Sequence, residues 1–148
     1  MGYTTDFDGE VKTDRPVDDK TYELINGLNR TRRMKRKIEG YGVEGEFYFN
    51  PDSNSCGQDW DDPTIVDSNN PPRTQPGLWM QWKMNSDKQT IEWDGGEKFY
   101  DYIEWMVYLI DKILAPKGYK VNGVIAWSGE EVRDNGEIIV VDNKVSVF

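Results

Sequence analysis

The most regular pattern of hydrophobic and polar positions lies between residues 75 and 114. Apolar residues first alternate with polar ones over residues 78–84, which is the period of a half-buried strand. A second short apolar stretch follows at 89–93, and the intervening residues 85–88 predict the turn of a β-hairpin. The alternation places Trp79 on the face opposite the core. The predicted core face is formed by Leu78, Met80, Trp82 and Met84.

After the hairpin, apolar residues recur every three or four positions, which is the period of an amphipathic helix. The pattern predicts this helix over about residues 97–114, with Asp94 as its N-cap and Glu97 as the partner in a capping-box-like arrangement. Pro116 ends it, because proline cannot continue a helix. The predicted core face consists of Phe99, Tyr102, Ile103, Met106, Ile110 and Ile113.

In the N-terminal part, residues 3–12 alternate loosely and predict a first strand. A helix is predicted over about residues 19–37, with Asp18 as its N-cap. Its apolar side is thin, and Gly27 weakens its middle. The basic residues at its end suit the negative end of the helix dipole. A short strand is predicted at residues 46–49.

Residues 50–76 are rich in Asp, Asn, Ser and Pro, which predicts a long loop. A loop of this length in a compact domain is usually functional or disordered. It contains Trp60, Ile65 and Val66, so we expect it to be ordered or partly ordered and anchored on the domain.

The C-terminal part predicts antiparallel strands at 119–128, 138–141 and 145–148, with Asp134-Asn135-Gly136 as a hairpin signal. Together these elements predict an α+β fold. We expect a single domain over residues 1–148, in which two helices pack on one face of an antiparallel sheet.

The composition restricts where and on what the protein acts. The 27 acidic and 18 basic residues give a net charge of −9, which argues against general nucleic-acid binding. No stretch approaches the roughly 18 apolar residues of a membrane span, and the N-terminus lacks the pattern of a secretory signal. A single cysteine, Cys56, fits a reducing cytosol. We therefore expect a cytoplasmic protein without membrane association.

Positive charge is concentrated in one run between residues 30 and 37, with no acidic residue inside it. This run either complements the dipole of the predicted helix or steers a charged partner towards the protein. It consists of Arg30, Arg32, Arg33, Lys35, Arg36 and Lys37.

The absence of histidine from the sequence excludes Ser-His-Asp and Cys-His catalysis and the usual zinc sites. Phosphate-binding loops and dinucleotide fingerprints are also absent from it. Asp59, Asp61 and Asp62, together with Glu92, could bind a hard cation or divide acid and base roles. In so acidic a chain, however, such clusters arise without function. Catalysis by them is a weak alternative, and we expect no cofactor.

Most tryptophans are expected to lie in the core, because large aromatic side chains dominate burial. An aromatic ring beside an arginine can also stack a planar ligand such as a nucleobase. Trp79, Arg73 and the basic run are the residues available for such a nucleotide-like ligand, and Trp60 is a further candidate for binding a ligand or partner.

Several motifs occur in order along nearly the whole chain: MGYTTDFDGE at the start, TRRMKR at 31–36, QPGLWMQW at 75–82, EWDGGEKFYDYIEW at 92–105, and NGVIAWSGEE followed by DNGEIIVVDNKV. In these motifs the chain resembles a family of small acidic proteins of unknown function, encoded by tailed phages and by bacteria. Relatives often carry cysteine in the QPGLW stretch, whereas this chain has Met80. The resemblance implies a phage or bacterial cytosolic origin, but no reaction or cofactor.

These observations favour a non-catalytic binding protein, such as a phage accessory factor that acts on a host protein in counter-defence or host modulation. The alternatives are a protein that sequesters a nucleotide-like molecule and, less favoured, a carboxylate- or metal-dependent hydrolase. The predicted functional region comprises Trp79, the loop before it and the acidic junction at residues 92–97.

Overall fold

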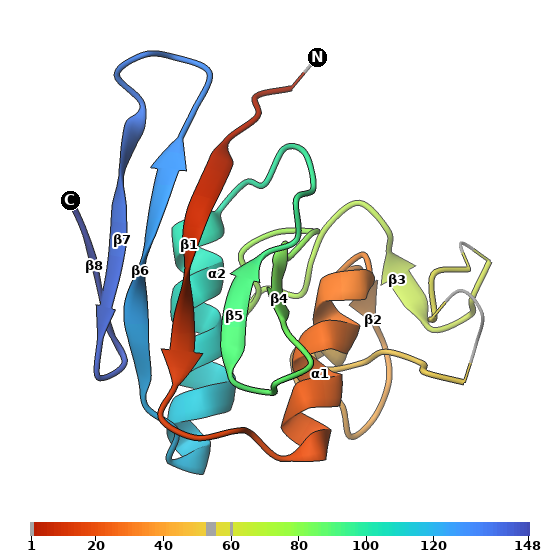
Figure 1. Cartoon of the computed structure of the whole chain (residues 1–148). Helices are drawn as coiled ribbons and strands as arrows, with labels where there is room; N and C mark the ends of the chain where they lie inside the picture. The colour runs from red at the N-terminus through yellow and green to blue at the C-terminus, as the bar shows by residue number, and fades with distance from the viewer. Residues whose placement is uncertain (1, 53–55, 60) are drawn as a thin grey trace.

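The computed structural model describes residues 2–52, 56–59 and 61–148. A six-stranded sheet in the order β4-β5-β1-β6-β7-β8 forms its centre (Figure 1), and every pair of neighbouring strands is antiparallel. The predicted α+β class is therefore confirmed. The strands are β1 (Asp6–Thr13), β4 (Trp82–Met84), β5 (Thr90–Trp93), β6 (Val121–Ser128), β7 (Asn135–Val141) and β8 (Lys144–Val147).

The central strand β1 pairs with β6 along its whole length, from Asp6 opposite Ser128 to Thr13 opposite Val121. The two backbones approach closely at Gly9, which has a φ of +111°. A Cβ atom at this position would lie 2.4 Å from the main-chain oxygen of Val124. Glycine is therefore required here both by the backbone conformation and by the neighbouring strand.

The helix that covers one face of the sheet is α2 (Tyr102–Tyr108), which continues as the π-helical segment η2 (Leu109–Leu114) and the 3₁₀ segment η3 (Ala115–Lys117) (Figure 1). The predicted start at residue 97 and the predicted N-cap Asp94 are wrong. One oxygen of Asp94 accepts a hydrogen bond from the main-chain N–H of Gly96 at 2.8 Å, and the other accepts one from the Asn29 side chain at 3.0 Å. Asp94 therefore forms a turn after β5 instead of capping α2.

The core lies between the sheet and the helices, and both helices contribute to the same cluster of buried residues. Trp82 and Trp105 are completely buried, as expected for most tryptophans. The ring of Phe7 meets that of Trp82 edge-on at 5.1 Å, and Phe99 meets the same ring at 5.0 Å. Of the predicted core face of α2, Met106, Ile110 and Ile113 are buried, as is Phe99 before it, and Tyr102 and Ile103 are partly buried.

The first helix, α1, spans Asp19–Arg30, with Asp18 accepting a hydrogen bond from the main-chain N–H of Thr21 as predicted for its N-cap. The predicted end at residue 37 is wrong, because the chain is already extended at Thr31. The basic run therefore leaves the helix. Two of its residues form β2 (Lys35–Arg36), which pairs with β3 (Ile65–Asp67) in a small second sheet.

Side chains of α1 close the outer edge of β4. Asn26 donates to the main-chain oxygen of Met84 and accepts from its N–H, both at 2.9 Å. Asn29 donates to the main-chain oxygens of Met80 at 2.9 Å and Trp82 at 3.1 Å. These amides replace the hydrogen bonds that a neighbouring strand would make, so this edge of the sheet is covered.

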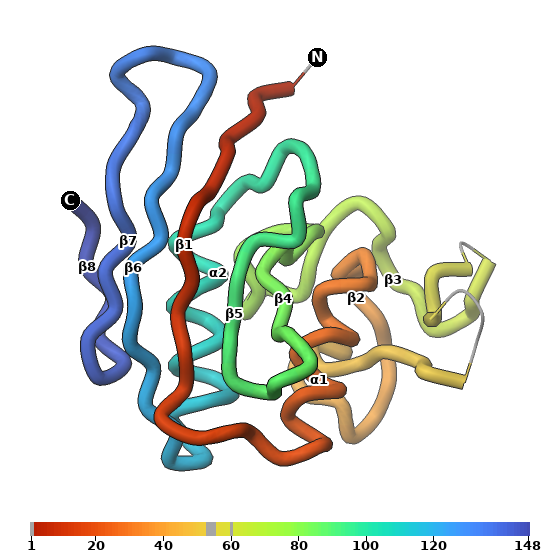
Figure 2. Tube along the Cα trace, viewed as in Figure 1, coloured from red at the N-terminus to blue at the C-terminus, as the bar shows by residue number. Residues whose placement is uncertain are grey.

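The described residues between 31 and 76 gather beside α1, on the side of the molecule away from β8 (Figure 2); we call these residues the lobe. It contains β2, β3 and the 3₁₀ turn η1 (Val43–Gly45). The strand predicted at residues 46–49 is wrong, because Phe47 and Tyr48 donate to Tyr41 and Gly45 in a turn that follows η1. Within the long loop, the prediction for Trp60 falls outside the described residues.

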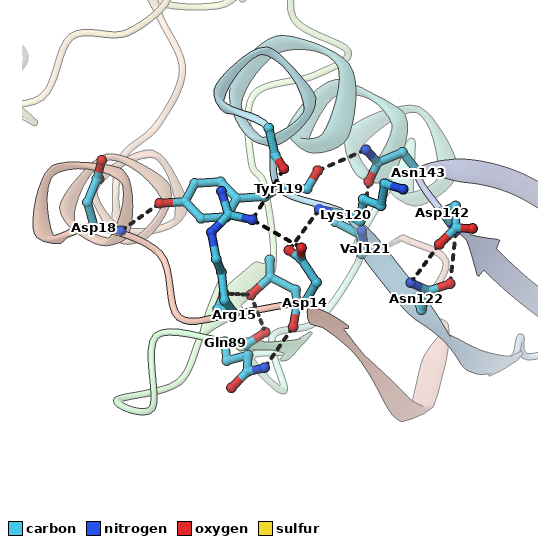
Figure 3. Close-up of polar contacts among 12 residues, drawn as sticks. Asp14, Arg15, Asp18, Gln89, Tyr119, Lys120, Val121, Asn122, Asp142 and Asn143 are labelled. Atoms are coloured by element: carbon cyan, nitrogen blue, oxygen red, sulfur yellow. Dashed lines mark hydrogen bonds and ion pairs between the residues drawn. The ribbon is translucent and has the colours of Figure 1, made fainter.

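At the end of the molecule near the start of α1, a polar network joins three connections between elements (Figure 3). Asp14 exchanges main-chain and side-chain hydrogen bonds with Lys120. The hydroxyl of Tyr119 accepts from the main-chain N–H of Asp18 at 3.0 Å, and Asn143 donates to the main-chain oxygen of Tyr119 at 2.9 Å. These contacts fix the connections that follow β1, α2 and β7.

Candidate functional site

A pocket of about 480 Å³ opens beside the β4–β5 hairpin. One wall comes from residues 77–81, which lead into β4, and the other comes from residues 97–101, which connect β5 to α2. The lining residues are Gly77, Leu78, Trp79, Gln81, Glu97, Lys98, Tyr100 and Asp101.

Two exposed aromatic side chains line the pocket. Trp79 is 43% exposed, whereas its neighbour Met80 is completely buried, which confirms the predicted alternation at this point. Tyr100 is 52% exposed, and its hydroxyl accepts a hydrogen bond from the main-chain N–H of Tyr3 at 3.0 Å. Exposed aromatic rings around a concavity are typical of binding sites.

Two buried polar atoms beside the pocket have no hydrogen-bond partner within the described part of the chain: Nε1 of Trp105 and Oε1 of Gln81. The amide of Gln81 is held by its other end, which donates to the main-chain oxygen of Glu97 at 2.8 Å. Leaving such a group unpaired costs about 1–3 kcal/mol. Native proteins rarely keep an unpaired buried group without a reason, and both atoms are shielded from solvent in this conformation.

The indole nitrogen of Trp105 lies close to Gly77. A Cβ atom at position 77 would lie 3.7 Å from Trp105 Nε1 and 3.1 Å from Asp101 Oδ2. Any side chain at this position would therefore crowd the carboxylate of Asp101 in the pocket lining. The position thus brings a donor and a carboxylate oxygen to the same point.

The wall formed by residues 97–101 is conformationally strained. Lys98 and Asp101 have φ values of +59° and +58°, in the left-handed region that non-glycine residues seldom occupy. Such strain concentrates at functional sites. The pKa of Asp101 is raised, first because its carboxyl is partly desolvated and second because of the nearby charge of Glu104.

No protein-family model, curated protein or solved structure matches the chain. In the described residues, no helix combines the length and the apolar character needed to cross a membrane. The geometry of the pocket is therefore the basis for a functional proposal.

The structure places the predicted ligand-binding residues Arg33 and Arg36 inside the lobe, where both are buried and only Arg36 lines a pocket. The guanidinium of Arg33 donates to the main-chain oxygens of Glu46 at 2.8 Å and Tyr48 at 2.9 Å, and burial lowers its pKa to about 10. Arg36 donates to the main-chain oxygen of Gly57. These two arginines anchor the lobe from inside.

The remaining predicted arginines also lie outside the pocket of Trp79. Arg30 is exposed at the end of α1, and Arg32 donates to the main-chain oxygen of Ser68 at 2.9 Å. Arg73 forms an ion pair with Glu44 at 2.6 Å. None of them lines the pocket, so the predicted combination of Trp79 with the basic run is not brought together.

Part of the basic run instead lines a second pocket of about 490 Å³ in the lobe. Lys35 and Lys37 contribute positive charge there, but Glu39 and Glu44 lie in the same wall. Glu44 is already paired with Arg73. In the described residues, none of the buried atoms without a hydrogen-bond partner belongs to the lining of this second pocket, so we base the functional proposal on the pocket of Trp79.

The acidic residues proposed for a hydrolase serve other roles or stand apart. Asp62 accepts hydrogen bonds from Thr64 and lies 3.6 Å from Arg36. Asp59 and Asp61 are exposed, and Glu92 faces Lys83 at 3.8 Å on the sheet. In the described ranges, no group of three or more His, Cys, Asp or Glu side chains is placed to hold a metal ion.

Sequence reasoning missed most of this pocket. The predicted junction at residues 92–97 overlaps the pocket only at Glu97. The helix predicted over about residues 97–114 includes Tyr100 and Asp101, and neither belongs to its predicted core face. The Asp94-Gly95-Gly96 turn was a usable signal, because two consecutive glycines also allow an irregular connection.

Proposed function

We propose that this protein is a non-catalytic binding protein that holds a segment of a partner protein in the pocket between residues 77–81 and 97–101. The observation that supports it best is the presence of two exposed aromatic rings, Trp79 and Tyr100, in the lining of one pocket. The unpartnered buried atoms Trp105 Nε1 and Gln81 Oε1 lie beside the same segments. Aromatic anchors and buried polar groups are the features that dominate the energy of protein interfaces.

Charge favours a polypeptide over a phosphorylated ligand. The pocket contains the carboxylates of Glu97 and Asp101 against the single amine of Lys98, and the whole chain carries a net charge of −9. A phosphate group would be repelled by this field. Arginine is suited to bind phosphate, but Arg33 and Arg36 are buried in the lobe. A nucleotide-like ligand is therefore the second choice.

The source of the partner follows from the motifs that resemble proteins of phages and bacteria. We infer a bacterial host protein as the partner and the host cytoplasm as the place of action. In this proposal the protein modulates the host, or counters its defence, by occupying a partner and not by chemical modification of it.

Site-specific photo-crosslinking tests the proposal. A photoreactive benzoyl-phenylalanine replaces Tyr100 at the pocket or, as a matched control, Tyr41, which is 43% exposed in the lobe. In a lysate of the bacterial host, position 100 is expected to give a discrete adduct that position 41 does not give. Trp79→Ala in the same chain is expected to remove most of it. Equal labelling from both positions, or an adduct insensitive to Trp79, would contradict the proposal.

Thermal unfolding with added nucleotides tests the second choice, a nucleotide-like ligand, against a protein partner. A ligand at 100 times its Kd adds about 2.7 kcal/mol to the free energy of unfolding. A nucleotide that stabilises the parent protein but not the Trp79→Ala variant would favour a small-molecule ligand over a protein partner. We expect no such stabilisation.

A further inference from the structure

Hydrogen-bond acceptors predominate among the free groups of the pocket. The carboxylates of Glu97 and Asp101 face no basic group within 4.0 Å in the described residues, and Oε1 of Gln81 is a buried acceptor without a donor. A ligand group that suits these acceptors brings several donors and a positive charge, and it leaves the donors of Trp105 and Lys98 without a new partner. The guanidinium group of arginine has five N–H donors in one plane.

The aromatic residues of the pocket suit the same group. A guanidinium is planar and weakly hydrated, so it stacks on aromatic rings more readily than an ammonium group does. Trp79 and Tyr100 supply two such rings at the pocket, and both are accessible to solvent. A guanidinium stacked on either ring would keep its edges free for the acceptors.

The protein already uses this combination once, inside the lobe. The guanidinium of Arg36 lies 4.8 Å from the centre of the Tyr48 ring. It also lies 3.6 Å from a carboxylate oxygen of Asp62 and donates to the main-chain oxygen of Gly57. An aromatic ring, a carboxylate and an amide-type oxygen thus bind one arginine in this fold.

The pocket offers the same three kinds of group without the arginine. Trp79 and Tyr100 provide rings and Asp101 provides a carboxylate, and the amide oxygen of Gln81 is buried beside them. We propose that the pocket binds the side chain of an arginine from the partner protein. This inference rests on the proposed function, because it names the group that the partner inserts. The net charge of −9 would further favour the approach of a basic segment.

Peptide binding tests the proposal directly. The probes are acetyl-Gly-Gly-Arg-Gly-Gly-amide and the same peptide with citrulline, which has nearly the shape of arginine but no charge. The measurements are calorimetry and the ¹H–¹⁵N resonance of the Trp105 indole. We expect the arginine peptide to bind about tenfold or more tightly than the citrulline peptide, equivalent to about 1.4 kcal/mol, and to shift the indole resonance.

Two variants locate the site. Asp101→Asn removes the charge but keeps a residue that tolerates the left-handed conformation, so it is expected to weaken arginine binding about tenfold while the protein remains folded. Trp79→Ala is expected to weaken it by a similar factor. Tyr41→Ala, on the lobe, is the control and is expected to leave the affinity unchanged.

The outcomes separate this inference from the proposed function. Equal binding of both peptides, or an indole resonance that neither peptide moves, would overturn the arginine site. A Trp79-dependent crosslink to a partner combined with either of those results would leave the proposed function standing and overturn the arginine site alone. Arginine binding with no crosslinked partner would overturn the proposed function and leave the arginine site supported.

Discussion

The main-chain N–H of Arg33 donates to the main-chain oxygen of Leu78 at 2.7 Å. This bond ties the lobe to one wall of the pocket. The side chain of Arg33 continues inward to Glu46, whose carboxylate accepts from the hydroxyl of Tyr108 on α2 at 3.2 Å. The lobe, the pocket wall and α2 therefore meet at one buried arginine.

Replacing Arg33 by methionine is expected to lower the free energy of unfolding by about 3 kcal/mol, because several buried acceptors lose their donor. Urea denaturation followed by circular dichroism measures the change. Arg30→Met, at the exposed end of α1, is the control and is expected to change stability by no more than about 0.5 kcal/mol. Equal stability of the two variants would show that Arg33 is not an anchor.

Removing the amide that covers β4 is expected to destabilise the sheet edge. Asn26→Ala leaves both main-chain groups of Met84 unpaired and should cost about 1–2 kcal/mol. Hydrogen exchange of the Met84 amide should accelerate by more than that of Ile91 in the neighbouring strand β5. Asn69→Ala, in the exposed part of the lobe, should leave the exchange of Met84 unchanged. An unchanged rate in the Asn26 variant would refute the covering role.

Two glycine substitutions separate the stability cost of a left-handed backbone conformation from the cost of steric overlap with a neighbouring strand. Gly95 has a φ of +84° with nothing within 4 Å of an added Cβ, whereas an added Cβ at Gly9 would overlap the oxygen of Val124. Gly95→Ala is expected to cost about 1–2 kcal/mol from conformation alone. Gly9→Ala should cost about 1–3 kcal/mol more, because overpacking adds to the strain. Thermal unfolding of both variants gives the difference, and equal losses would contradict it.

The charge of Asp101 is expected to reduce stability at neutral pH. The raised pKa of Asp101 means that the folded state holds this proton more tightly than the unfolded chain does. The contribution of Asp101 to the free energy of unfolding is fully present below the pKa that the group has in the unfolded chain. It is lost as the pH rises through the pKa that the group has in the folded state. Asp101→Asn should therefore gain stability over the parent as the pH increases from about 3 to 7, as measured by urea denaturation.

Asp18 is the control, because its contribution to the free energy of unfolding is expected to change with pH in the opposite direction. Hydrogen bonds from Thr21 hold the pKa of Asp18 below its usual value, so its contribution is present above the unfolded pKa and lost as the pH falls through the folded pKa. Asp18→Asn should therefore lose stability relative to the parent as the pH rises over the same range. The same trend in both variants would contradict the assignment for Asp101.

The strands of the sheet and the core side of α2 could be predicted because local periodicity coincides with burial on one face. The end of α1 could not. A basic run suits a helix C-terminus locally, but the carbonyl groups that draw Arg33 and Arg36 inward come from Glu46 and Gly57. Partners so distant in the sequence leave no local pattern.

The candidate site was predictable to a similar, partial degree. Alternation alone placed Trp79 off the core face. Asp94 had the residue type and position of an N-cap, yet it binds Gly96 and the Asn29 side chain instead. The irregular segment that follows carries Asp101 into the pocket lining, and the contact of Asp94 with Asn29 on α1 has no local sequence pattern.

The bond between Arg33 and Leu78 also has a practical use. Exchange of the Arg33 amide hydrogen with solvent requires that its bond to the Leu78 oxygen open, so its rate reports how often this wall of the pocket moves. A partner that fills the pocket and steadies Leu78 would slow that exchange. One amide in the lobe is thus a native reporter of occupancy, and it needs no label on the pocket itself.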